Sequence, residues 1–249
     1  MSQPLSVALR QGTTQAHTLA ENTAFMKCFI KGIVEREPLR KLFGDFYFIY
    51  GELETAFCRH AGHPILSQLY FPELNRTAAL AQDLEFYFGP AWKGLIQLTP
   101  AGKIYCDRIK VLADTQPELL IAHAYVRYLG DLSGGQGLKG IIRSALGLTD
   151  QRGTEFYEFA AMPSIEAKRA FKEGYRQALD SLTLDAALID QIVTEANFVF
   201  QLNRDVMHEL EPEVKAAIGE YTFDLLTRQD RPGSTVRLQG AVSREVAVV

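Results

Sequence analysis

The segment 125–138 holds the residues with the clearest chemical potential, because glycines interrupt a helix-forming sequence there. Four glycines fall within eight positions, Gly130, Gly134, Gly135 and Gly137. A glycine inside a helix costs about 1 kcal/mol relative to alanine, so the cluster needs a physical reason. Two reasons remain open: a turn that joins two helices, or close approach of the backbone to a flat, bulky ligand. Phosphate-binding loops do not fit, because no strand precedes the glycines and no Gly-Lys-Ser/Thr follows them.

A second candidate is the pair formed by His17 and Glu21. Their spacing of four places the imidazole and the carboxylate one helical turn apart on the same face. A carboxylate that holds one ring nitrogen fixes the tautomer and leaves the other nitrogen free to bind a metal. The same pair is common on solvated helices, so the spacing alone favours an ordinary surface or core pair.

The other histidines do not indicate a second metal site. His60 and His63 lie beside Cys58 near a predicted helix end, where zinc is conceivable but a capping or surface role fits better. His123 lies in an apolar helix and His208 near the end of another, so we expect core or surface roles for both.

Helices must position these groups, because the apolar spacing is helical almost throughout and no segment alternates as a strand does. The predicted class is all-α, one compact domain of about eight helices. One helix is predicted from Leu5 to about Lys27, with Arg10, Thr13, His17 and Glu21 on one stripe. Another begins near Pro38 and buries Leu39, Leu42, Phe43, Phe46, Ile49, Tyr50, Leu53 and Phe57. Further starts are predicted at Pro100 after Thr99, at Pro117, at Ser164 and at Asp185, and stops at Gly89-Pro90 and Glu211-Pro212.

Length and composition favour one soluble domain. The chain has 249 residues, 47% of them hydrophobic, and a formal net charge of -4. We expect one folded domain over 1–230 and a mobile polar tail over 231–249. No apolar run could span a membrane and no signal peptide is evident, which predicts a cytoplasmic protein without a membrane partner. The charge argues against nucleic acid, and three widely spaced cysteines predict reduced thiols.

Two motifs resemble those of a known family. The sequence Tyr-Leu-Gly-Asp-Leu-Ser-Gly-Gly-Gln at 128–136 resembles the distal-helix signature of heme oxygenases. The sequence Gln-Ala-His-Thr-Leu-Ala-Glu-Asn at 15–22 resembles their proximal-helix signature. The similarity continues through 46–50, 171–176 and 200–203, so it spans about residues 5–210. The resemblance implies that heme b lies between a proximal helix and a glycine-kinked distal helix.

The resemblance also implies which residues hold the heme. His17 matches the axial ligand of the iron, and Glu21 matches the carboxylate that holds its other nitrogen. Cations and hydroxyls at the propionate edge would bind the negative charges there. The matching residues are Arg10, Tyr125, Lys172 and Arg176, and Phe200 also matches a heme-contacting position. Arg10 stands where animal members have lysine, which keeps the charge.

Asp131 matches the catalytic centre of the family. A carboxylate that acts through ordered water can deliver a proton while restraining oxygen. Tyr50, Arg127 and Asn203 match the positions that extend this network. Gly130 and Gly134 would let the backbone lie against the heme and direct oxygen toward one meso edge.

The implied reaction converts heme and O₂ to biliverdin, expected to be the IX-alpha isomer, with release of CO and Fe²⁺. The chain has no flavin, nicotinamide or iron–sulfur motif, so an electron donor must dock, and the resemblance implies ferredoxin. A downstream bilin reductase is a further implied partner. The alternatives are a heme carrier that does not turn over and a heme-free hydrolase of the thiaminase-like helical fold. The hydrolase would need a nucleophilic cysteine, and the sequence shows no matching signature.

Overall fold

The computed structural model describes residues 3–228, and every regular element in that range is a helix. Its α-helices number eleven: α1 (Leu5–Gly12), α2 (Thr14–Glu21), α3 (Ala24–Ile30), α4 (Arg36–Arg59), α5 (Thr77–Phe88), α6 (Pro100–Thr115), α7 (Leu120–Leu132), α8 (Gly134–Leu146), α9 (Ile165–Ser181), α10 (Ala186–Ile218) and α11 (Glu220–Thr227). Short 3-10 helices join them: η1 (Leu66–Leu69), η2 (Pro72–Leu74), η3 (Trp92–Gly94), η4 (Pro117–Leu119) and η5 (Glu155–Tyr157). The predicted all-α domain is confirmed, but about eight helices was too few.

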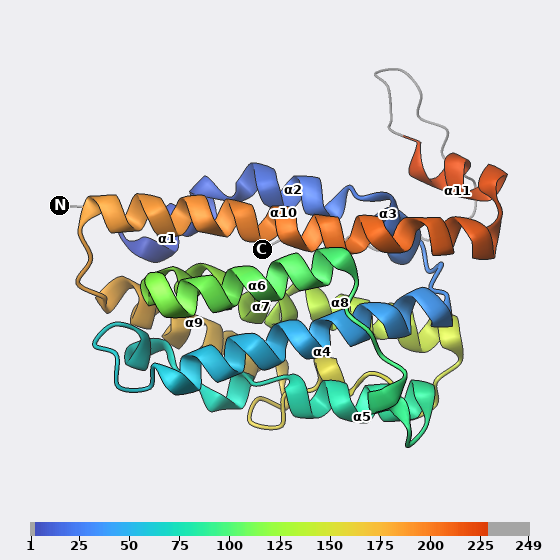
Figure 1. Ribbon diagram of the computed structural model, residues 1–249, viewed down its shortest axis with the longest axis horizontal. Helices are drawn as coiled ribbons and strands as arrows, with labels where there is room; N and C mark the ends of the chain where they lie inside the picture. Colours follow the sequence, from blue (N-terminus) through green and yellow to red (C-terminus); the bar gives the residue numbers. More distant parts are fainter. Residues whose placement is uncertain (1–2, 229–249) are drawn as a thin grey trace.

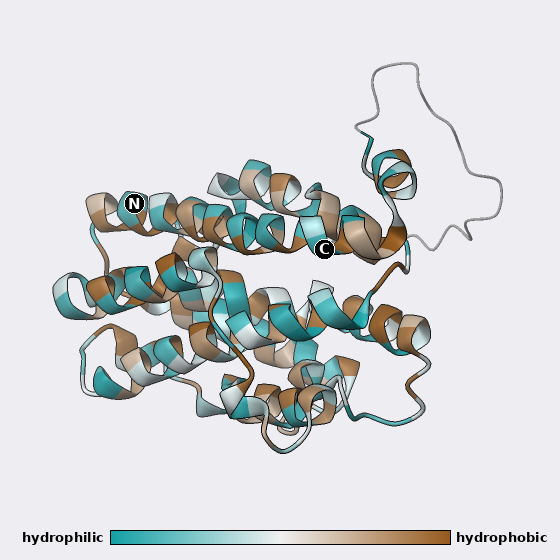
Figure 2. Ribbon diagram, turned by 45° about the vertical axis from the view of Figure 1, so that its right-hand side comes forward, coloured by the Kyte–Doolittle hydropathy of each residue, from teal (hydrophilic) through white to brown (hydrophobic). Residues whose placement is uncertain are grey.

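The long helix α10 organises the bundle. It runs the length of the molecule and contacts α1, α2 and α3 as well as α4, α6 and α7 (Figure 1). Helix α4 packs in turn against α5 and α6. Each long helix carries both hydrophobic and hydrophilic residues (Figure 2), as expected when one side of a helix faces a core. The proximal and distal segments of the sequence therefore both pack on one helix.

Local sequence signals account for most of the helix ends. The eight apolar residues predicted to form the buried face of α4 are all buried. The side chains of Thr99, Ser164 and Asp185 each accept a hydrogen bond from a backbone N–H in the first turn of α6, α9 and α10. Helix α5 ends at Phe88, directly before Gly89 at φ +83°, where the sequence predicted a stop.

The single helix predicted from Leu5 to Lys27 is wrong, because the chain divides there into α1, α2 and α3. The hydroxyl of Thr13 donates to the Leu9 carbonyl at 2.8 Å and Thr13 leaves helical geometry at ψ 0°. Thr23 caps α3 by accepting from the N–H of Met26 at 3.2 Å. Threonine hydroxyls compete for backbone partners, and here they turn the chain twice. His17 and Glu21 nevertheless share one helix, α2.

The predicted stop at Glu211-Pro212 is also wrong, because Pro212 lies inside α10, which continues to Ile218. Proline removes one backbone donor and disfavours a helix interior. Tertiary contacts offset this cost: Leu210 and Val214 are buried, and Glu211 accepts the N–H of Ala24 at 3.0 Å. Packing against α3 and α11 thus outweighs the local signal.

The predicted tail over 231–249 lies outside the described residues, so the domain boundary stays a prediction. Among the helices of 3–228, none has the length and apolar character needed to cross a membrane.

Candidate active site

The glycine-rich segment breaks one helix into two, as the sequence predicted. Helix α7 ends at Leu132 and α8 begins at Gly134, with Ser133 between them at φ -112° and ψ -93°. A Cβ added at Gly130, Gly134 or Gly137 would meet no atom within 4 Å. These three glycines therefore present bare backbone to open space rather than to a packed neighbour. The structure thus contains the turn between two helices and also a surface that a flat group could approach closely.

Behind the break, four polar side chains form a buried network. The Tyr50 hydroxyl donates to Oδ2 of Asp131, and Nε of Arg127 donates to the Tyr50 oxygen at 3.0 Å. Arg127 also donates to Oδ1 of Asn203 at 2.6 Å and lies 3.7 Å from Oδ1 of Asp131. Helices α4, α7 and α10 supply these residues. The structure brings together the four side chains that the resemblance had grouped.

Burial sets the protonation of this network. It raises the pKa of Asp131 to about 6, although the Arg127 charge and the Tyr50 hydrogen bond act in the opposite direction. Burial also holds the pKa of the Tyr50 hydroxyl well above its ordinary range, so that hydroxyl remains a donor. Asp131 can therefore gain or release a proton near neutral pH while its neighbours stay fixed.

Aromatic rings hold the Arg127 guanidinium in place. Its central carbon lies 4.2 Å from the centre of the Phe46 ring and 5.0 Å from that of Tyr50. Cation–π contacts of this kind gain strength where water is excluded. The amide of Asn203 is fixed as well, because it donates to the Val199 carbonyl at 2.8 Å. The network is consequently rigid from its aromatic base to Asp131.

The proximal side is much more open. Nδ1 of His17 lies 3.6 Å from Oε2 of Glu21, and the two side chains are 50% and 49% exposed. The Phe200 ring packs edge-on against the imidazole, with ring centres 5.6 Å apart. The predicted pair is present, and Nε2 has no protein partner within the described part of the chain. Such an imidazole suits a metal that approaches from outside the protein.

The predicted edge residues come from three helices. Burial raises the pKa of Tyr125, whereas the nearby charges of Arg176 and Arg10 act to lower it. Those three residues are therefore neighbours. Lys172 donates to the hydroxyl of Ser133, in the helix break, at 3.1 Å. Burial and Arg176 lower its pKa. The cluster supplies positive charge at one end of the glycine-lined surface.

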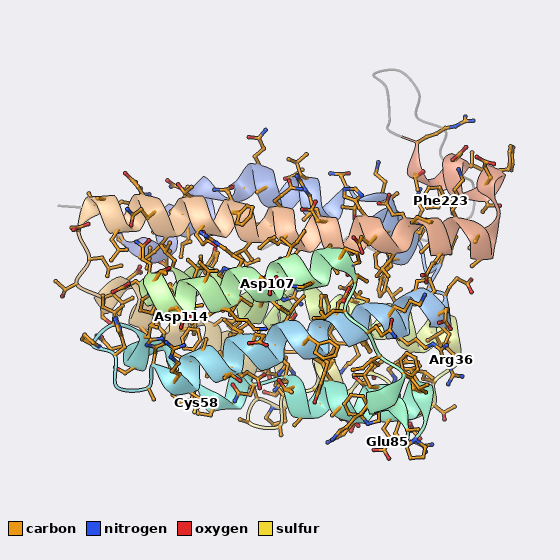
Figure 3. The ribbon with its side chains drawn as sticks, in the orientation of Figure 1. Arg36, Cys58, Glu85, Asp107, Asp114 and Phe223 are labelled. Carbon is orange, nitrogen blue, oxygen red and sulfur yellow. The ribbon has the colours of Figure 1, made fainter. Side chains whose placement is uncertain are left out.

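The other histidines and the cysteines would be the candidates for a separate metal site. Within residues 3–228, no group of three His, Cys, Asp or Glu side chains could hold a metal ion. His63 accepts backbone N–H groups as a cap, as predicted. His60 contacts the Ala113 carbonyl at 2.8 Å. Cys58 lies exposed at the end of α4 (Figure 3), and the other two cysteines are buried free thiols.

Sequence reasoning missed the residues that support the network from behind. Gln136 donates to the backbone carbonyls of Asp131 and Tyr157, at 3.2 and 3.0 Å. Arg76 is 5% exposed, and its charge acts on Asp131. Gln136 lies within the distal motif, but nothing in its spacing distinguished it. Arg76 is 55 positions from Asp131, so only the fold could reveal its proximity.

This fold and site define an all-helical enzyme whose buried carboxyl network opens beside a glycine-broken helix. A profile of the family described as heme oxygenase matches residues 3–209. Heme oxygenase 2 of Synechocystis is 62% identical over 231 residues, covering 93% of this chain and 92% of that protein. Heme oxygenase 1 of Nostoc is 50% identical, covering 94% and 98%. The chain belongs to the heme oxygenase family.

Solved structures agree with this assignment. The crystal structure of heme oxygenase-2 from Synechocystis sp. PCC 6803 in complex with heme and NO superimposes with a TM-score of 0.91 at 61% identity. The match covers 93% of this chain and 95% of that one. Heme oxygenase-1 from the same cyanobacterium, in complex with heme, gives a TM-score of 0.84 at 48% identity, covering 90% and 100%.

Proposed function

We propose that this chain binds heme b as both substrate and cofactor and cleaves it oxidatively to biliverdin, CO and Fe²⁺. The carrying observation is the open glycine surface of α7 and α8, with the buried Asp131 network directly behind it. A surface of bare backbone fits a flat macrocycle, because side chains would hold the ring away. The two Synechocystis relatives were crystallised with heme, which supports the same ligand here.

On the proximal side, His17 would bind the iron through Nε2 while Glu21 restrains Nδ1. Phe200 limits how far the imidazole can rotate. Arg10, Tyr125, Lys172 and Arg176 would bind the propionates, whose negative charge matches this cluster. In this proposal Lys172 exchanges its Ser133 partner for a propionate or binds both.

On the distal side, the chain's own residues control protons and water. Bound heme supplies the iron that activates O₂ and the porphyrin that is cleaved. Asp131 would hold ordered water above the glycine surface and move a proton through it, because its carboxyl titrates near neutral pH. Tyr50, Arg127 and Asn203 keep that carboxyl in one orientation. Gly130 and Gly134 would let a heme edge approach the backbone, because neither carries a side chain, and this would favour a single isomer, biliverdin IX-alpha.

We propose reduced ferredoxin as the electron donor and a bilin reductase as the downstream partner. Helix α9 carries Lys168, Lys172 and Arg176 at spacings of four, which places them on one face, and Arg169 lies three positions before Lys172 beside them. An acidic donor would be attracted to such a face. Turnover driven by ferredoxin should slow as salt is raised. The proposed compartment is the cytoplasm.

A single turnover in the presence of heme, O₂ and reduced ferredoxin tests the function. The wild-type protein should lose its Soret band and yield a bilin, whereas a heme carrier would keep the Soret band. Asp131→Ala should still bind heme but form biliverdin at least about a hundredfold more slowly, the lower end of the range for removing a general acid. An unchanged bilin yield in that variant would remove Asp131 from the mechanism.

A further inference from the structure

A segment at 153–159, here called the strap, lies between helix α5 and the helix break. Its far side is tied down by three buried side chains. The Asp83 carboxylate accepts two backbone N–H groups of the strap, each at 2.8 Å. The Tyr87 hydroxyl donates to a strap carbonyl at 2.8 Å, and Arg76 donates to two more. Because α5 packs on α4, the strap is fixed relative to the helix that carries Tyr50.

The side of the strap that faces the helix break packs against the start of α8. The ring of Tyr157 lies so close to Gly135 that an added Cβ would be 3.2 Å from it. Lys139 of α8 pairs with Glu158 of the strap at 2.8 Å. Gly135 is buried, in contrast to Gly134 beside it, which faces open space. One side of the break is thus packed on the strap while the other side stays open.

Gln136 joins the strap to the catalytic residue itself. Its side-chain nitrogen donates to the Asp131 carbonyl at 3.2 Å and to the Tyr157 carbonyl at 3.0 Å. A primary amide carries two N–H donors, so both are used. The Asp131 carbonyl belongs to the last turn of α7, where helical carbonyls lack partners within the helix. Gln136 thereby supplies the hydrogen bond that the Asp131 carbonyl lacks within the helix. The same amide links the end of α7 to the Tyr157 carbonyl of the strap.

We propose that Gln136 is a positioning residue. It fixes where Asp131 and the Gly130 backbone lie relative to bound heme, and so determines the edge at which heme is oxidised. The inference rests on the proposed role of Asp131. Its physical basis is the pair of hydrogen bonds, here called the bracket, that the Gln136 amide donates to the Asp131 carbonyl and to the Tyr157 carbonyl of the strap. Without the bracket, the end of α7 can shift relative to the strap, and the buried network would move with it.

Two variants remove the bracket in different ways. Gln136→Met keeps the side-chain length but removes both donors. Gln136→Glu keeps the shape but places carboxylate oxygens against two carbonyls. We expect kcat to fall at least about twofold to tenfold in the Met variant, the range for losing the hydrogen bond to the Asp131 carbonyl alone, and further in the Glu variant. KM for heme should stay within about twofold, because the proximal and propionate contacts are intact.

The decisive readout is the ratio of biliverdin isomers after single turnover, which loss of folded protein alone would not alter. The main isomer should decrease in the order wild type, Met variant, Glu variant. Gln68→Met is the matched control, because exposed Gln68 also donates to a carbonyl, that of Pro64, at 2.8 Å. It should match the wild type. Wild-type kcat and isomer ratio in Gln136→Met would overturn the proposal.

Two further variants cover the case in which Gln136→Met does not fold and separate this proposal from the proposed function. Gly135→Ala presses α8 away from Tyr157 and leaves the Gln136 donors in place, so the isomer ratio should shift even if Gln136→Met does not fold. An unshifted ratio in Gly135→Ala, when Gln136→Met does not fold, would also overturn the proposal. Asp131→Ala separates the two levels of inference. If it keeps full bilin yield, the proposed function of Asp131 fails; if only the Gln136 and Gly135 variants behave as wild type, the positioning role alone fails.

Discussion

The two sides of the site are built in opposite ways. On the distal side, the Arg127 and Asp131 side chains are each 9% exposed and share partners from three helices. On the proximal side, His17 and Glu21 are about half exposed; they pair with each other, and the Phe200 ring packs against His17. On the distal side, the polar groups find their partners within the protein. On the proximal side, the exposed groups can gain further partners only from a bound ligand. In the proposed function, the fold holds the residues that would direct the chemistry, and the proximal residues would gain their partner when heme binds.

Helix α10 connects the two sides. Phe200 contacts His17, and Asn203, one turn further along, accepts from Arg127. Residues three apart lie on the same face of a helix, so one helix sets the distance between the proposed axial ligand and the buried polar network. This contrast predicts that proximal variants affect heme ligation without affecting folding, and that distal variants affect turnover or folding while heme is still bound.

The largest expected effect is the loss of axial ligation in His17→Ala. Normal coordination of the iron should disappear, with a changed Soret band and electron paramagnetic resonance signal, and added imidazole should restore much of it. Unfolding free energy of the heme-free protein should change by about 0.5 kcal/mol or less, because the side chain is exposed. The matched control is His208→Ala, which removes an exposed histidine paired with Glu211 at 2.9 Å. A normal heme spectrum in His17→Ala would contradict the assignment.

Arg127→Met should produce the largest loss of stability. Breaking a buried ion pair leaves Asp131 without its partner, at a cost of about 3–5 kcal/mol. Urea unfolding of the heme-free protein measures this loss. Arg152→Met is the control, because Arg152 pairs with Asp150 at 2.8 Å on the surface with its side chain 72% exposed. If both arginine variants lose the same unfolding free energy, the distal network does not depend on the buried Arg127.

Asp131→Asn should change how stability depends on pH. Since burial raises the pKa of Asp131 to about 6, the folded protein binds more protons than the unfolded chain between about pH 4 and 6. Unfolding free energy therefore falls as pH rises through that window, by about 3 kcal/mol at most, and is level above it. The asparagine variant lacks this fall, so its stability relative to wild type should rise from pH 4 to pH 7.

Asp107→Asn is the control for that pH series. The Lys103 hydrogen bond lowers the pKa of the exposed Asp107, so its removal should act in the opposite direction. Equal slopes for wild type and Asp131→Asn would show that the Asp131 carboxyl keeps its ordinary pKa in the folded protein.

The sequence predicted features that depend on local interactions and missed those that depend on distant ones. The caps at Thr99, Ser164 and Asp185 follow from side chains bonding their own helices. The stop at Pro212 failed because packing of α10 outweighs a local preference. In the site, spacing indicated the glycine break, but the roles of His17, Tyr50 and Asn203 required the family resemblance. The strap could not be predicted, because its contacts with α5 and α8 join segments whose proximity only the fold creates.

Glu21→Gln should give the smallest effect and the sharpest test of the proximal side. In the heme-free protein the pair at 3.6 Å is exposed, so losing its charge should change stability by less than about 0.5 kcal/mol. If His17 binds the heme iron as proposed, the Glu21 carboxylate would restrain that imidazole, and partners of this kind contribute about tenfold or more to metal affinity. We expect weaker heme binding by roughly that factor, measured by absorption titration. A large loss of stability without a change in affinity would mean that the proximal side, like the distal one, is completed by the fold.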